Sequence, residues 1–361
     1  MDALPVGHPH RRKRARVSND YAWFAECLAC PRDHARLRHE GARLVCEQGH
    51  EYPVEDGIPV MLRDDVPQTI EFVDASLRRA RGETAGDPRA PHLYLESLGI
   101  SEQEKQGVVT LARAGGPIDP VVAHLVAATN GLMYREQVGT LGHYPIPPIR
   151  LPPGQGARLL DVGCSWGRWT LAGARRGYRA VGIDPSLGAV MAARRVARSM
   201  KIDAQFVVGD ARYLPFQPSL FRRVYSYSVL QHFAKPDAAL AIGEMARVLE
   251  PGGAAKVQMP SALGVRCLYH QARRGFRDPS GFEVRYWSLP SLKRSFGVVG
   301  AAGFEVDGFF GIGLQPSDAA MMPPSRKAIL GASEFLRSAS RIVTPLLWAA
   351  DSVFVEAVKP S

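Results

Sequence analysis

The sequence predicts an α/β protein built on a doubly wound, mostly parallel sheet, with a small cysteine-rich segment ahead of it. From about residue 155 onward, short apolar runs alternate with helical stretches, and acidic residues end the first three runs. Three of the five cysteines lie within residues 27–46, which predicts a separate segment there. At 361 residues the chain exceeds the usual length of one domain, so a large domain with a smaller one fits.

Composition indicates a globular protein with an uneven positive charge. Hydrophobic residues make up 46% of the chain, enough for a sizeable core. Because no run has the length and purity of a membrane-spanning helix, and the first residues lack the apolar stretch of a signal peptide, we expect a soluble, cytoplasmic protein. The net charge is +10, and positions 11–14 and 16 are all basic. They lie in a tail, residues 1–20, that we expect to be disordered; it either binds an anionic partner or is solvated.

A zinc ribbon is predicted for residues 21–65. Cys27 and Cys30 are spaced C-x-x-C, and Cys46 and His50 follow as C-x-x-x-H, a spacing expected of a four-ligand zinc site. Four protein ligands leave no position for water, so the zinc would be structural and would supply folding energy that so short a segment lacks. The alternative is a chance arrangement without metal.

A helical lid and linker is predicted for residues 66–150. Polar turns at GETAGDPRAP and RAGGPIDP interrupt the helical stretches, and HYPIPPIRLPPGQG is rich in proline, which blocks helix continuation. Farther along the chain, a cap segment at residues 261–290 carries five arginines interleaved with aromatic residues. This cap either recognises an anionic acceptor or presents a solvated basic face.

The alternation of strands and helices falls within the remaining domain, residues 151–361. The expected strands are ARLLDVG, RAVGID, AQFVVGD, RRVYSYSVL and GAAKVQM, separated by helices such as RWTLAGARR. Strands alternating with helices of this length imply right-handed βαβ units and a mostly parallel sheet. FEVDGFF and FVEAVK add two strands, joined by a long helical excursion.

Ligands of such sheets bind beyond the carboxyl ends of the strands, where the strand order reverses. Gly163 and Gly167, in the first strand-to-helix turn, let the backbone approach a ligand. Asp161 ends the first strand. Asp184 ends the second, where a carboxylate can accept both hydroxyls of a ribose, and Asp210 ends the third, where it can accept from an adenine amino group. A dinucleotide site would need G-x-G-x-x-G, so D-V-G-C-S-W-G with three acids favours a cationic adenosine ligand, S-adenosylmethionine.

The motifs LLDVGCSWGRW, VGIDPS, VVGDARYLPF, YSYSVLQHF and RVLEPGG, in this order over roughly residues 155–260, resemble the type 11 family of class I S-adenosylmethionine-dependent methyltransferases. The resemblance implies a seven-stranded methyltransferase sheet. It also implies a cofactor site in which the methionine moiety lies among Asp161, Gly163, Cys164 and Gly167, the ribose on Asp184, the adenine on Asp210 and the backbone of Ala211, and Ser228 on the pocket wall. Where Ser165 stands, the family usually has glycine.

Methyl transfer is an in-line displacement at the sulfonium methyl, so much of the catalysis can come from orienting the acceptor. His232, in LQHF just past the fourth strand, is the candidate general base for a hydroxyl acceptor; otherwise it caps or packs the strand end. We expect methyl transfer to oxygen of a small-molecule, lipid or glycan acceptor.

The stretch YPVEDGIPVML, which follows the last zinc ligand, resembles the small zinc ribbon of the tRNA-methyltransferase activator family. A Cys-Cys-Cys-His ribbon in this place is also similar to that of the bacterial large-subunit rRNA guanine methyltransferases, where the ribbon helps to bind RNA. The alternative function is therefore methylation of rRNA or tRNA, with the ribbon and tail binding RNA. A second alternative is a non-catalytic, methyltransferase-like adaptor.

Overall fold

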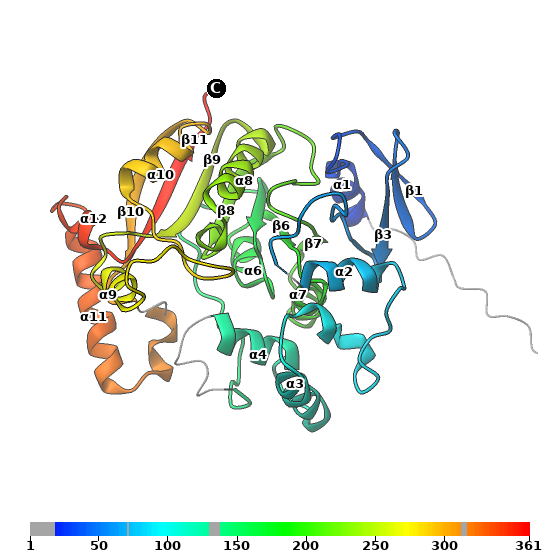
Figure 1. Ribbon diagram of the computed structural model, residues 1–361, viewed down its shortest axis with the longest axis horizontal. Helices are drawn as coiled ribbons and strands as arrows, with labels where there is room; N and C mark the ends of the chain where they lie inside the picture. The colour runs from blue at the N-terminus through cyan, green and yellow to red at the C-terminus, as the bar shows by residue number, and fades with distance from the viewer. Residues whose placement is uncertain (1–18, 71, 130–137, 312–315) are drawn as a thin grey trace, which may run out of the picture.

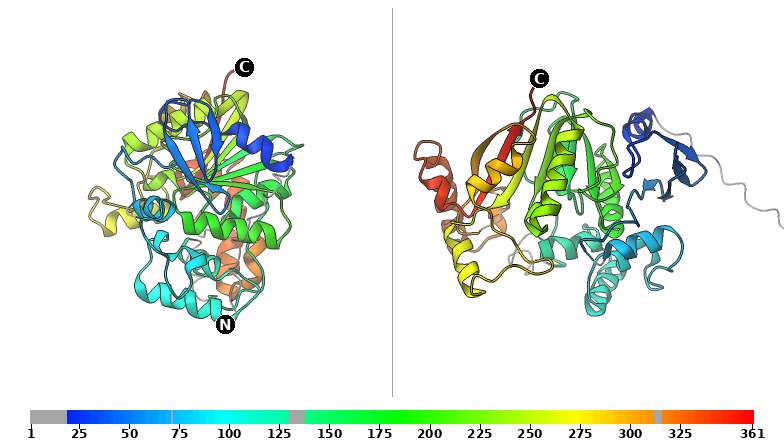
Figure 2. Two further views of the ribbon diagram at one scale, coloured as in Figure 1. Left: turned by 90° about the vertical axis from the view of Figure 1, so that its right-hand side faces the viewer. Right: turned by 45° about the horizontal axis from the view of Figure 1, so that its top comes forward.

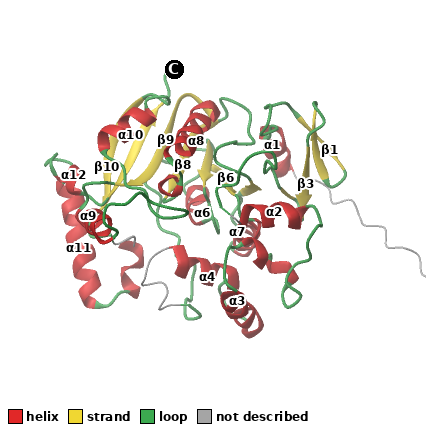
Figure 3. Cartoon of the chain, viewed as in Figure 1, coloured by secondary structure: helices red, strands yellow, loops and turns green. Residues whose placement is uncertain are grey.

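The computed structural model describes residues 19–70, 72–129, 138–311 and 316–361. The basic cluster at positions 11–14 and 16 lies outside the described residues. Figures 1 and 3 show a small β-unit at one end of the molecule, a large α/β unit, and a group of helices along one edge of both.

The central sheet confirms the predicted fold class. Its strand order is β10-β11-β9-β8-β5-β6-β7. The pairs β9–β8, β8–β5, β5–β6 and β6–β7 are parallel, whereas β11 pairs antiparallel with both β9 and β10. Strand order reverses between β5 and β8. The strands are β5 (Arg158–Val162), β6 (Arg179–Asp184), β7 (Gln205–Val208), β8 (Phe221–Tyr227), β9 (Leu249–Pro260), β10 (Ala301–Gly308) and β11 (Ser352–Val358).

Both faces of this sheet are covered by helices, so its central strands are apolar on both sides. Leu159 and Leu160 are neighbours in β5 and point to opposite faces. Leu159 packs with Trp169, whereas Leu160 lies in the cluster of Met245. The helices of this unit are α6 (Arg168–Arg175), α7 (Leu187–Ser199), α8 (Lys235–Val248), α9 (Val265–Arg273), α10 (Leu289–Phe296), α11 (Pro324–Ala339) and α12 (Leu346–Ala349).

The N-terminal unit is a four-stranded antiparallel sheet preceded by α1 (Asn19–Cys27). Its strands are β1 (Leu37–Glu40), β2 (Arg43–Cys46), β3 (Glu51–Glu55) and β4 (Ile58–Pro59). The unit attaches to the edge strand of the central sheet: Val60 forms a parallel bridge with Val208, and the Met61 N–H donates to the Val208 carbonyl over 2.7 Å. Figure 2 shows the unit beside this edge.

The segment between the two sheets contains several helices. It contains α2 (Phe72–Ala80), 3₁₀ turns at Pro91–Leu93 and Leu95–Ser97, α3 (Glu102–Ala114) and α4 (Pro120–Thr129). Buried side chains of this segment share one apolar cluster with α7, so the lid is packed on the α/β unit. No helix in the described part of the chain is long and apolar enough to cross a membrane.

Candidate active site

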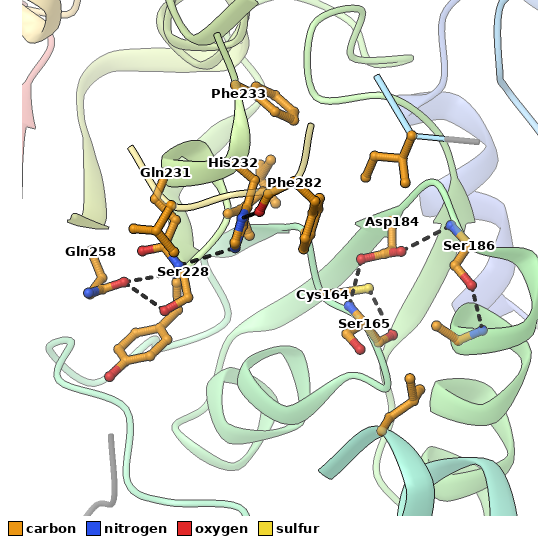
Figure 4. Close-up of a pocket in the computed structure, with 18 of the residues that line it drawn as sticks. Cys164, Ser165, Asp184, Ser186, Ser228, Gln231, His232, Phe233, Gln258 and Phe282 are labelled. Carbon is orange, nitrogen blue, oxygen red and sulfur yellow. Dashed lines mark hydrogen bonds between the residues drawn. The ribbon is translucent and has the colours of Figure 1, made fainter. Parts of the chain in front are cut away.

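A cavity of about 1250 Å³ lies at the carboxyl ends of β5, β6 and β8. Lid residues such as Phe72 and Leu125 line one side, and cap residues such as Phe282 line another. This volume exceeds the roughly 300–1,000 Å³ of usual ligand pockets, so the cavity has room for two molecules. Figure 4 shows its two halves, one at the turn after β5 and one at the turn after β8.

The turn between β5 and α6 forms the first half. Gly163 has a φ of 77°, and a Cβ on it would lie 2.2 Å from a methyl of Val229, so only glycine fits. Cys164 lines the cavity next to it, but its side chain is buried and desolvation raises the pKa of its thiol well above the usual value, which fits packing rather than nucleophilic attack.

Two residues predicted to touch the cofactor lie behind the cavity wall. Gly167 begins α6 with a φ of 85°, and its missing Cβ makes room for Ala193 and Phe206. Asp161 is 1% exposed; its Oδ2 accepts from Thr170 Oγ1 over 2.7 Å, while Oδ1 has no hydrogen-bond partner. Burial raises the pKa of Asp161 to about 7. Neither residue lines the cavity, so their role there is to shape the turn.

Ser165 adopts the left-handed conformation, with a φ of 47°. This conformation costs a non-glycine residue roughly 1–2 kcal/mol, which explains why the resembling family usually has glycine here. The Ser165 backbone N–H donates to Asp184 Oδ2 over 2.9 Å. Serine therefore keeps the shape of the turn at the cost of some strain.

Asp184 faces the cavity from the end of β6. Its Oδ1 accepts from the Ser186 N–H over 3.0 Å and its Oδ2 from Ser165, so each oxygen retains capacity for a second donor. Burial raises the pKa of this carboxyl to about 6. The geometry suits a carboxylate that accepts from two neighbouring hydroxyls.

Asp210 lines the cavity after β7, but its carboxylate is held by Arg212. Arg212 Nη2 lies 2.7 Å from Asp210 Oδ2, and the Arg212 N–H donates to Oδ1 over 2.8 Å. Arg212 also donates to the Pro67 carbonyl, which ties this turn to the lid. The sequence does not reveal this ion pair. Because Arg212 occupies the carboxylate of Asp210, the backbone around Ala211 is the other candidate contact for adenine.

The turn after β8 forms the second half of the cavity. Ser228 has a φ of 60°, and both its N–H and its hydroxyl donate to Gln258 Oε1 over 2.9 Å. His232 stacks on Phe282 with ring centroids 3.9 Å apart, and its Nδ1 lies 2.7 Å from the Phe282 carbonyl oxygen. A carbonyl can only accept, so Nδ1 carries the proton and Nε2 has the lone pair.

The environment of His232 favours the neutral imidazole. Burial lowers its pKa below the usual value, more than its hydrogen bond to Phe282 raises it. Nε2 lies 3.2 Å from the Gln231 amide nitrogen, which donates to it. The predicted base therefore lines the cavity in the protonation state that a base needs.

A buried polar network lies beside His232's half of the cavity. Asp307 Oδ2 accepts from Tyr227 Oη and Ser352 Oγ, each over 2.9 Å, and Asp307 Oδ1 lies 3.2 Å from Arg150 Nη1. Burial raises the pKa of Asp307 despite Arg150. These side chains come from β8, β10, β11 and the linker, and no local motif marks them.

The cap arginines mostly hold the cap together. Arg274 donates to the Val284 carbonyl over 3.0 Å, and Arg277 pairs with Glu283 over 2.6 Å. Arg285 donates to the His232 carbonyl over 2.7 Å. Arg266 is the cap arginine that lines the cavity. Most of the arginines that suggested an anionic acceptor therefore make hydrogen bonds within the cap and do not face the cavity.

A second cluster of functional groups lies in the N-terminal unit. The Sγ atoms of Cys30 and Cys46, Nδ1 of His50 and a carboxylate oxygen of Asp33 all lie within 4.8 Å of one another. Cys27 is not in this group, and its thiol donates to the Trp23 carbonyl over 3.0 Å. The group thus holds three of the four predicted ligands, with Asp33 in the place expected for Cys27.

Comparisons with known proteins agree with the α/β site. Residues 159–253 match the family model described as a methyltransferase domain. Demethylmenaquinone methyltransferase of Renibacterium salmoninarum is 29% identical over 46% of this chain and 74% of that protein. Ubiquinone biosynthesis O-methyltransferase of Alkalilimnicola ehrlichii is 34% identical over 27% of this chain and 40% of that protein.

Among solved structures, Haemonchus contortus phosphoethanolamine N-methyltransferase 2 in complex with S-adenosyl-L-methionine has a TM-score of 0.39 and 20% identity, covering 58% of this chain and 50% of that one. The chain spans less than half the length of most of the curated relatives that it matches. The family match shows that residues 159–253, which include all or part of five strands of the central sheet, form a methyltransferase domain.

Asp184→Asn should lower the affinity for S-adenosylmethionine by about 10–100-fold, because hydrogen bonds to a charged acceptor contribute about 1.5–3 kcal/mol. Titration calorimetry would measure the dissociation constants of the variant and the wild type. Wild-type affinity should fall as pH is lowered through about 6, where the carboxyl takes up a proton, and the variant should lose this pH dependence. Asp203→Asn, on an exposed loop, is the control. Unchanged affinity of Asp184→Asn would remove Asp184 from the site.

Proposed function

We propose that the protein transfers a methyl group from S-adenosylmethionine to an oxygen of a small-molecule acceptor. The observation that carries this proposal is one cavity in which Gly163 and Asp184 line one half and His232 lines the other. The contact between Gly163 and Val229 joins the two halves, so a donor and an acceptor bound there would be neighbours.

The residues at the ends of β5 and β6 fit this cofactor. Asp184 can accept from both ribose hydroxyls, and the turn at Gly163 lets the backbone lie against the ligand. The turn after β7, with Asp210 and Ala211, would face the adenine. When bound, the cofactor supplies an electrophilic methyl group on a sulfonium.

His232 would act as the base. Its proton on Nδ1 is fixed by the Phe282 carbonyl, which leaves the Nε2 lone pair for the hydroxyl proton of the acceptor. The Gln231 amide now donates to Nε2, so the acceptor hydroxyl would take its place. Phe282 stacks on the ring and holds its plane.

The lid and the cap would exclude water from the reacting atoms. Phe72 and Leu125 of the lid line the cavity together with Phe282 of the cap. Enclosure of this kind favours an acceptor small enough to enter whole, and the relatives named for small-molecule substrates support that class. The RNA and adaptor hypotheses remain predictions, although an open cavity lined by Asp184 and His232 supports turnover.

The test uses purified protein, S-adenosylmethionine labelled in its methyl group, and a fractionated extract of the host lacking this gene. Label is expected in a small-molecule fraction, with an ether or ester as the product. Label in RNA that nuclease treatment removes would instead support the RNA hypothesis. Cofactor binding without any labelled fraction would support the adaptor.

His232→Asn should lower kcat on the acceptor so identified by about 10²–10⁴-fold, because general bases contribute this much. The Asn amide nitrogen can keep the hydrogen bond to Phe282 but has no counterpart of Nε2. Wild-type kcat should fall at a pH below the usual histidine pKa, since the pKa of His232 is lowered. The variant should not show this fall of kcat at low pH. His143→Asn, on an exposed loop, is the control, and equal kcat in both variants would exclude His232 as the base.

We further propose that Cys30, Asp33, Cys46 and His50 hold a structural zinc ion. Ligand bonds of about 2.0–2.3 Å in a tetrahedron place neighbouring ligand atoms roughly 3.3–3.8 Å apart. His50 Nδ1 lies 3.5 Å from Cys30 Sγ, 3.3 Å from Cys46 Sγ and 3.1 Å from Asp33 Oδ2. Cys46 Sγ and Asp33 Oδ2 are 3.7 Å apart. The donor set and these separations fit one zinc ion.

The surroundings support a closed, structural site. Tyr52 Oη lies 3.1 Å from Cys30 Sγ and would donate to the thiolate, as outer partners of metal sites do. The His50 N–H also lies 3.3 Å from Cys46 Sγ. With four protein ligands no position remains for water, so the ion would stabilise the N-terminal unit and take no part in methyl transfer.

Elemental analysis of the purified chain should find one zinc per molecule. Cys46→Ser should lose the metal and lower the melting temperature, because metal binding supplies folding energy. Cys27→Ser is the matched control and should keep the metal. If Cys27→Ser lost the zinc and Asp33→Asn kept it, the C-x-x-C ligand set would be right instead.

A further inference from the structure

Helix α9, in the cap, exposes an apolar face. Val265, Leu268 and Tyr269 have 61%, 40% and 57% of their surface exposed, and Phe276, just beyond the helix, has 67%. The first three are spaced i, i+3 and i+4, so they lie on one side of the helix, and the exposed Ala272 continues the row. These five residues are called the α9 apolar face.

Two arginines border this face. Arg266 and Arg273 are spaced i and i+7, and both are exposed. His270 lies between them as a neutral imidazole, because its Nε2 accepts from Arg266 Nε over 3.2 Å, and burial and the two arginines lower its pKa. No acidic residue occurs between positions 261 and 277. The first acids after this stretch are Asp278, which is exposed, and Glu283, which pairs with Arg277 over 2.6 Å. Residues 261–290 carry five arginines and these two acids, so the segment keeps a net positive charge.

The opposite side of α9 is anchored and faces the cavity. Asp351 Oδ1 accepts from the backbone N–H groups of Arg266 and Cys267 over 2.7 and 3.2 Å, which holds the first turn against β11. Arg266, Cys267 and His270 also line the cavity. One helix thus forms a wall of the acceptor half and presents apolar side chains to solvent.

Further apolar side chains are exposed at the same end of the molecule. Phe335 of α11 has 71% of its surface exposed, Ile342 has 87% and Trp348 of α12 has 45%. Figures 1 and 2 place α9, α11 and α12 at the end opposite the N-terminal sheet. Single exposed apolar residues are common, but several on one helix in a segment of net positive charge are typical of helices that lie in a membrane interface.

We propose that the α9 apolar face docks on an anionic lipid bilayer. Leu268, Tyr269 and Phe276 would enter the interface while Arg273 lies at the level of the lipid phosphates. The positive border selects an anionic bilayer over a neutral one. If the protein transfers methyl groups as proposed above, docking on a bilayer would also place the cavity next to a source of hydrophobic acceptors. With one short helix and few cations, the attachment is reversible.

The experiment sediments the full-length protein with vesicles of phosphatidylcholine alone or with phosphatidylglycerol added. Binding to the anionic vesicles is expected, weakened at high salt because salt screens the arginines. Leu268→Glu combined with Phe276→Glu should reduce the partition coefficient at least about tenfold, since each side chain loses the free energy of burial. Val298→Glu, also on an exposed site at 62%, is the matched control.

Absence of wild-type binding to the anionic vesicles, or equal binding by the double variant, would overturn the proposal. So would a dimer in sedimentation velocity that the double variant abolishes, since a second copy would then cover the face. Cofactor affinity of the variant, measured by calorimetry, should match wild type and shows that it is folded. The assay contains no acceptor, so its result is separate from that of the methyl-transfer experiment.

Discussion

The backbone pairing of Met61 with Val208 is the constraint on which the arrangement of the molecule depends. β7 is the edge strand of the central sheet, and an unpaired edge leaves backbone groups without partners. The N-terminal unit covers that edge, and two further bonds, Ala29 to Pro215 and Gln217 to Cys27, clamp the segment after it. Because this segment carries Asp210, the N-terminal unit shapes the part of the cavity wall after β7 without entering the cavity.

Strain and close packing are concentrated where the two halves of the cavity meet. Ser165 and Ser228 both adopt left-handed backbone conformations, and each is held by an acceptor that also faces the cavity, Asp184 for the first and Gln258 for the second. Residues in such conformations persist only where their surroundings hold them. The contact of Gly163 with Val229 joins the two strained turns, so a displacement of one turn should shift the other.

The sheet, its strand ends and the position of His232 beside the cavity could be predicted because each rests on a local pattern: apolar runs, a turn, or a short motif just past a strand. Other features depend on contacts that no local pattern encodes. Arg212 neutralises Asp210 from two residues away, yet only the fold shows that its side chain turns back. Asp307 meets Tyr227 across the sheet. Cysteine spacing predicted Cys27 as a ligand, whereas the cluster in the structure contains Asp33.

The strand order places the N-terminal unit and the cap at different parts of the cavity, which limits the role of each. The N-terminal unit contacts the sheet at β7, and the cap follows β9, with β8, β5 and β6 between them. His232 lies on the cap side, where Arg285 and Phe282 hold it. An acceptor bound by the N-terminal unit would have to reach past the Asp184 half of the cavity to meet His232. The architecture therefore favours a stabilising role for the N-terminal unit and acceptor recognition by the cap, since the cap segment lines the cavity beside His232 and also presents a surface of its own to solvent.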